Sequence, residues 1–104
     1  MTAAQRRYTM AALRQYGRRR WRRTEANKLW DEAIEESLQY YEKHDPVRAD
    51  LMRLRYFGNC TEQQVLDQLH IGRTTYQKAQ QDMLSTVAIC AAQRGVLPPG
   101  LQRR

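Results

Sequence analysis

The stretch "TEQQVLDQLHIGRTTYQKAQQDML", residues 61–84, holds the pattern that decides the fold. It consists of two helical segments separated by a short break at "HIG", residues 70–72. Thr61 followed by Gln64 forms a capping box, which begins the first helix. The second helix begins near Arg73 and continues beyond the quoted stretch.

Apolar residues in this stretch are spaced for two short helices that fold back on one another through a tight turn. They are Val65, Leu69, Ile71, Tyr76 and Ala79, at steps of four, two, five and three residues. Two arrangements fit this spacing. One is a helix-turn-helix, whose second helix enters a DNA groove, and the other is an ordinary helical hairpin with a polar surface.

The second helix is expected to turn a polar face outward. This face carries Arg73, Thr74, Gln77 and Lys78, and Thr75 lies beside it, where it suits a phosphate contact. All of these side chains can donate hydrogen bonds and none is acidic. Arginine and lysine match guanine edges and glutamine matches adenine, so the face has the chemistry that reading a DNA groove requires.

The rest of the chain also predicts helices, because prolines and glycines are few and no strand-like alternation occurs. Thr24 is an expected N-cap, Pro46 suits a first helical turn, and Gly95 is an expected C-cap. The fold class is therefore all-α. The expected helices cover about residues 2–16, 24–44, 46–57, 61–70 and 72–94.

Charge is distributed in blocks along the 104 residues. Residues 1–23 contain eight arginines and no acid, residues 24–46 carry a local charge of −5, and residues 47–104 carry +4. Basic blocks of this kind favour binding to a polyanion such as nucleic acid. Alternatively, the acidic block neutralises the basic ones across the fold.

An arginine run with a tryptophan inside it connects the first two helices. Two interpretations remain open. Either the run tracks phosphates or binds RNA with the indole stacked on a base, or the indole is core and the arginines form a solvated face or pair with the acidic helix. The run consists of Arg18, Arg19, Arg20, Trp21, Arg22 and Arg23.

The middle helix places Trp30, Ile34 and Tyr41 on an apolar face, and its acids are expected on the exposed face. These acids are Asp31, Glu32, Glu35, Glu36 and Glu42. Adjacent carboxylates on a solvated face do not suggest acid–base catalysis. The histidines and cysteines lack zinc-site spacing, and no phosphate loop or nucleophile motif is present. We expect no enzyme activity, no metal and no cofactor.

Several features indicate a cytoplasmic protein. No apolar run is long enough to span a membrane, and residues 1–23 lack the apolar segment of a secretory signal. Cys60 and Cys90 are expected to be free, packed thiols in a reducing compartment.

The segment "LMRLRYFGNCTEQQVLDQLHIGRTTYQKAQQDML", residues 51–84, resembles the C-terminal helix-turn-helix domain of bacterial sigma factors. The likeness lies in the "RLRYF" helix end, the threonine cap and the pattern of the two following helices. Bacteriophage late-gene transcriptional activators of the ArpU and RinA type share this sigma-like half after a charged helical segment, and "LRQY" at residues 13–16 is similar to theirs. The resemblance covers about a third of the chain.

This resemblance implies DNA contacts for particular residues. It places Arg73, Thr74, Gln77 and Lys78 at base edges or phosphates, and Thr61 and Arg53 or Arg55 near the DNA backbone. Two positions depart from the family pattern. Leu66 stands where a small residue is preferred, which implies a wider crossing or an outward Leu66, and His70 stands where glycine is common.

The sequence thus predicts a DNA-binding transcriptional regulator of a bacteriophage, acting in the cytoplasm of the bacterial host. Its partners would be double-stranded DNA and, by resemblance, RNA polymerase, with a homodimer as a further expectation. The alternatives are the small DNA-recognising subunit of a packaging terminase and an RNA-binding antiterminator. The expected organisation is a basic arm and acidic helix over residues 1–45, a sigma-like domain over 46–95 and a mobile tail over 96–104.

Overall fold

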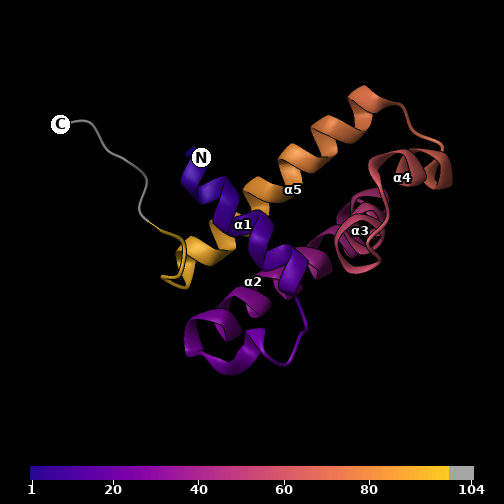
Figure 1. The fold of residues 1–104 in the computed structure, drawn as a ribbon. Helices are drawn as coiled ribbons and strands as arrows, with labels where there is room; N and C mark the ends of the chain where they lie inside the picture. The colour runs from indigo at the N-terminus through magenta and orange to yellow at the C-terminus, as the bar shows by residue number, and fades with distance from the viewer. Residues whose placement is uncertain (99–104) are drawn as a thin grey trace.

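A computed structural model describes residues 1–98 of the chain. These residues form five α-helices, one 3₁₀ turn (η1) and one π-helical turn (η2), with no β-strand among them (Figure 1). The predicted all-α class is confirmed. The elements are α1 (Ala3–Gln15), η1 (Trp21–Arg23), α2 (Glu25–His44), α3 (Pro46–Met52), η2 (Arg53–Phe57), α4 (Glu62–Leu69) and α5 (Arg73–Gln93).

Helix α5 is the longest element, with 21 residues, and it packs against α1, α2 and α3 (Figure 1). Met83, Leu84 and Val87 lie at its middle and are fully buried. Tyr76 and Ala79, nearer its start, are also buried. Helix α5 therefore begins directly after the turn at residues 70–72, and its middle forms part of the main core.

The N-terminal segment is part of the core and not a separate arm. Ala12 and Leu13 of α1 are fully buried in the cluster that contains Leu84, and Thr9 of the same helix is also fully buried. A capping box between Thr2 and Gln5 begins the helix. The charge pattern along the chain, from which a basic arm was predicted, gives no sign of this long-range packing.

Helix α2 buries the apolar face that its sequence predicts, including Trp30, Ile34 and Tyr41. The expectation that Asp31 is exposed is wrong, because this residue has no accessible surface. The cause is the preceding loop, which folds over α2 and brings polar partners to the carboxylate.

The ends of the helices follow the capping signals in the sequence. Thr24 and Thr61 cap α2 and α4 through their side chains, and Pro46 occupies the first turn of α3. Gly95 has a φ of 76° and ends α5 in a Schellman arrangement, in which the Val96 N–H donates to the Ala91 carbonyl at 3.1 Å.

Residues 96–98, at the start of the expected mobile tail, pack on the fold. Val96 and Leu97 are half-buried against the core, and the Gln5 side-chain amide donates to the Pro98 carbonyl at 2.9 Å. Residues 99–104 of the expected tail lie outside the described residues. Cys60 and Cys90 are free thiols, as predicted.

The expected helix over residues 46–57 ends in a wider turn. Residues 53–57 are π-helical, and the Gly58 N–H donates to the Arg53 carbonyl, five residues back, at 2.7 Å. A Cβ atom on Gly58 would lie 3.2 Å from the Leu54 carbonyl oxygen, which favours glycine there.

The turn between α4 and α5 is built around a left-handed residue. His70 has a φ of 55°, whereas Gly72 is extended with a φ of −84°. The conformational freedom of glycine is thus not used at residue 72. Leu66 is buried, so it faces inward and not outward. The Ile71 N–H donates to the Leu66 carbonyl at 3.2 Å, which closes the turn.

His70→Gly should stabilise the protein. A left-handed conformation costs a residue with a Cβ about 1–2 kcal/mol, and the added unfolded-chain entropy of glycine offsets roughly half of that gain. We expect the free energy of unfolding in urea to rise by about 0.5–1 kcal/mol. Gly95→Ala, which introduces the same strain at a φ of 76°, should lower it. A loss of stability in His70→Gly would mean that the imidazole itself holds the turn.

Candidate nucleic-acid interface

Helices α4 and α5 are joined by the three-residue turn at residues 70–72 and do not form a side-by-side hairpin. Helix α4 packs mainly on α3 and the π-turn, whereas α5 packs on α1, α2 and α3. An antiparallel hairpin would instead bury its two helices along one another. Figure 1 shows the turn and the start of α5 at one edge of the molecule.

The first two turns of α5 bring together the side chains that the sequence singled out. We call this set the donor face. Tyr76 and Ala79 of the same turns are buried in the core, so the donor face lies on the opposite side of the helix. The helix starts at Gly72 with no acidic residue in its first turn. The donor face consists of Arg73, Thr74, Thr75, Gln77 and Lys78, all exposed.

One carboxylate lies beside the donor face. Glu62 of α4 is 3.2 Å from the Arg73 guanidinium, and both side chains are open to solvent, at 38% and 62% exposure. An exposed pair of this kind contributes about 0–1 kcal/mol. Arg73 can therefore leave Glu62 for a stronger anionic partner at small cost.

Arg55 ties together the three parts of this region. Its Nε donates to the Tyr76 hydroxyl at 3.1 Å, and its Nη1 donates to the Cys60 carbonyl at 3.1 Å. One half-buried guanidinium thus connects the π-turn, the residue before the Thr61 cap and the first turns of α5. Arg55 therefore holds parts of the fold together, whereas the resemblance implied a DNA contact for this residue.

The other two residues implied near the DNA backbone also have partners inside the fold. Arg53 is paired with Glu42 and Asp50. The Thr61 hydroxyl accepts the Gln64 N–H at 3.2 Å as the cap of α4, and Thr61 remains exposed.

Sequence reasoning missed the roles of two tyrosines under the donor face. Tyr76 accepts from Arg55, and the buried Tyr56 hydroxyl accepts from the Gln80 side-chain amide at 2.8 Å. Burial raises the pKa of Tyr56, while Gln80 acts in the opposite direction. Buried tyrosines need such partners, so two tyrosines at core positions were a usable signal.

A second basic surface lies between α1 and α2. We call residues 17–24 the arginine loop. The Trp21 indole N–H donates to Asp31 Oδ1 at 3.1 Å, and Arg22 Nε lies 3.2 Å from Asp31 Oδ2. Burial raises the pKa of the Asp31 carboxyl, against the opposing effects of the Gly17 backbone N–H, Arg22 and Trp21. The loop is therefore anchored on a buried carboxylate.

Four arginines of this loop are exposed and, within residues 1–98, form no ion pair. They are Arg18, Arg19, Arg20 and Arg23. Of the arginines in this loop, only Arg22 pairs with α2, so pairing with the acidic helix does not account for the whole run, and the other four lie on a solvated face.

Four other acids of α2 interact with residues outside the arginine loop. Glu32 and Glu36 lie 3.7 and 2.6 Å from Arg94, and Glu42 pairs with Arg53. Glu35 accepts the Tyr16 hydroxyl at 3.0 Å. Burial and this carboxylate raise the pKa of Tyr16 to about 12.

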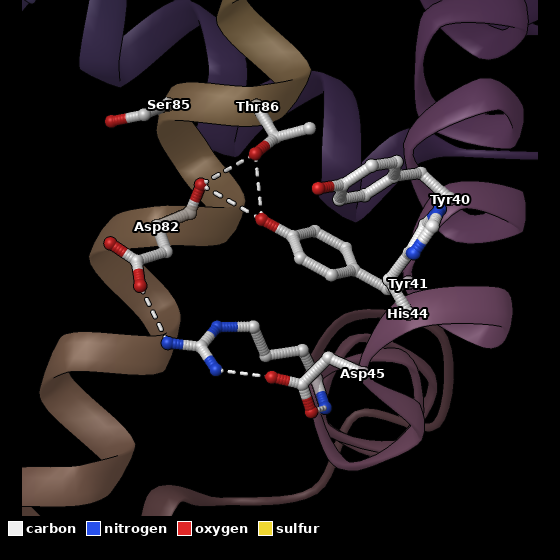
Figure 2. A pocket seen from close by; sticks show the side chains of 8 residues that line it. Tyr40, Tyr41, His44, Asp45, Asp82, Ser85 and Thr86 are labelled. Atoms are coloured by element: carbon white, nitrogen blue, oxygen red, sulfur yellow. Dashed lines mark hydrogen bonds and ion pairs between the residues drawn. The ribbon is translucent and has the colours of Figure 1, made fainter.

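A polar pocket of about 450 Å³ lies where α2, α3 and α5 meet (Figure 2). Arg48 reaches both Asp45 and Asp82 there, and the Tyr41 hydroxyl lies 2.6 Å from the Thr86 hydroxyl. The carboxylates of the pocket are thus engaged by Arg48, which joins α3 to α5. The sequence did not predict this junction.

Within residues 1–98, no three histidine, cysteine or acidic side chains lie close enough to hold a metal ion. No helix in this part of the chain is long and apolar enough to cross a membrane. Comparison with protein-family models, with curated proteins and with solved structures finds no match to this chain.

Tyr76→Phe tests whether Arg55 holds the start of α5. Removing the hydroxyl leaves the Arg55 Nε without its acceptor, so the free energy of unfolding in urea should fall by about 1–2 kcal/mol. Tyr8→Phe, which removes an exposed hydroxyl from α1, should leave it unchanged. Equal stability of the two variants would show that the Arg55–Tyr76 contact does not support the fold.

Proposed function

We propose that this protein binds double-stranded DNA in a sequence-specific manner and regulates transcription. The observation that carries the proposal is the donor face: five exposed donor side chains on the first turns of a helix whose opposite side is buried. Helix-turn-helix proteins place the N-terminal residues of their second helix against base edges in the major groove. The first helix of such a pair crosses the DNA backbone, and α4 would take that position.

The chemistry of the donor face suits a groove. Arg73 and Lys78 would donate to guanine, and Gln77 to adenine, while the two threonine hydroxyls reach phosphate oxygens. The start of α5 adds free backbone N–H groups and a partial positive charge toward a phosphate. Each good bidentate base contact contributes about 1–3 kcal/mol of discrimination.

The same proposal includes the finer expectations from the sequence. The likeness of residues 51–84 to sigma factors supports a regulator of the phage late-gene activator kind, working on promoter DNA beside RNA polymerase in the bacterial cytoplasm. The charge of +7 adds an electrostatic, sequence-independent contribution to DNA affinity.

Replacing Arg73 and Gln77 together by alanine should remove sequence preference. In a bind-and-sequence experiment on a random duplex library, the unmodified protein should enrich a narrow motif, and the double variant should lose that enrichment while retaining salt-sensitive binding. For the best motif, affinity should fall at least tenfold. Gln63→Ala and Gln68→Ala, exposed on α4, serve together as the control and should keep the motif. An unchanged motif in the Arg73 and Gln77 variant would contradict the assignment of the donor face.

Glu62→Gln should strengthen DNA binding. The change frees Arg73 and removes a negative charge beside the donor face, and an exposed pair contributes less than about 1 kcal/mol, so affinity should rise about two- to fivefold. Fluorescence anisotropy at constant salt measures this effect. Asp67→Asn removes an equal charge from α4 without touching Arg73, and it should have the smaller effect. Equal gains from the two variants would indicate a general charge effect and no special role for Arg73.

A further inference from the structure

The arginine loop is anchored on the fold, and within residues 1–98 four of its five arginines form no ion pair. The Trp21 indole is half-buried against the core and donates to a carboxylate that has no accessible surface. The anchor uses one guanidinium group of the loop, that of Arg22, so the other four project from a fixed segment. Pre-organised donors lose less entropy on binding than donors on a flexible chain.

The chemistry of the loop suits a phosphate backbone. Guanidinium groups bind phosphate oxygens in a bidentate manner and release condensed counterions. The 3₁₀ turn of three residues is too short to enter a groove as a helix would, so sequence reading is not expected there. The indole is engaged with Asp31 and is not free to stack on an unpaired base, which favours duplex DNA over single-stranded RNA.

The loop and the donor face lie at different ends of the molecule. In Figure 1 the loop between α1 and α2 is at the lower end, and the start of α5 is at the upper edge, with α2 and α3 between them. The molecule measures 41 × 37 × 24 Å. A straight duplex seated on the donor face therefore leaves the loop pointing to another site.

We propose that the arginine loop binds the phosphate backbone of a second DNA duplex, so that one molecule bridges two stretches of DNA. This inference rests on the proposed function, because the donor face supplies the first duplex. The second contact is independent of sequence and sensitive to salt. It would hold distant DNA segments together at the regulated site.

A two-duplex capture experiment tests the bridge. A duplex carrying the enriched motif is immobilised and saturated with protein, and capture of a fluorescent duplex of unrelated sequence is measured at several salt concentrations. The unmodified protein should capture the second duplex. Arg19→Gln with Arg20→Gln should lower capture at least tenfold and reduce the slope of log affinity against log salt by about two, one for each lost phosphate contact.

The matched control removes the same charge from another exposed surface. Arg6 and Arg7 are exposed on α1, and Arg6→Gln with Arg7→Gln should retain most of the capture. Both double variants should bind the immobilised motif within about threefold of the unmodified protein, since a charge far from the donor face is largely screened at physiological salt. Circular dichroism shows whether each variant keeps its helices.

Three outcomes would overturn the bridge. Binding of the motif without capture of the second duplex refutes the bridge and leaves the proposed function intact. If the Arg19 and Arg20 variant loses affinity for the motif as strongly as it loses capture, the loop contacts the same duplex. If single-stranded RNA displaces the second duplex better than duplex DNA at equal phosphate concentration, the loop is an RNA site. Absence of any enriched motif, by contrast, contradicts the proposed function itself.

Discussion

The continuity of α5 is the constraint on which the rest of the structure depends. A single helix of 21 residues provides the donor face in its first turns and the centre of the core in its second half. Met83, Leu84 and Val87 are fully buried, and burying each such side chain contributes about 1.5–3 kcal/mol. The orientation of the donor face is therefore set by the packing of α1 and α2 around the far end of the same helix. A rotation of α5 that turned Tyr76 outward would also expose Leu84 and Val87.

Two polar side chains, one half-buried and one buried, hold the donor face and the arginine loop in place on this core. Arg55 joins the π-turn to Tyr76 and to the residue before the α4 cap, so the start of α5 cannot shift independently of α4. In the same way, Asp31 fixes the arginine loop on α2 through its contacts with Trp21 and Arg22. Breaking one side of such a contact leaves an unsatisfied group, which costs more than the contact itself contributes. Each basic surface is thus supported from beneath by one polar side chain.

The sequence predicted what depends on near neighbours along the chain. Caps at Thr24 and Thr61, the helix end at Gly95 and the inward residues of α2 and α5 follow from local chemistry and from a period of 3.6 residues. The outward placement of the donor face follows from the same period. Local patterns were silent on the packing of α1 in the core and on the burial of Asp31, because each depends on contacts between distant segments. The task of Arg55 was missed for a related reason: its partner Tyr76 lies 21 residues away.

The partners of the acids on α2 determine which arginines remain available to bind a polyanion. Glu32, Glu36 and Glu42 pair with arginines that follow α2 in the chain, and Glu35 accepts from Tyr16. None of these four pairs with the arginine loop. Folding thus pairs Arg53 and Arg94 with these acids and leaves four exposed arginines together at the loop, while α1 and the start of α5 carry further exposed cations. Cations that lie close together create a higher local potential than the same charge spread evenly over the surface, and this favours close phosphate contacts at the loop. The acids of α2 therefore serve mainly to hold the fold together, while the four exposed arginines of the loop stay unpaired.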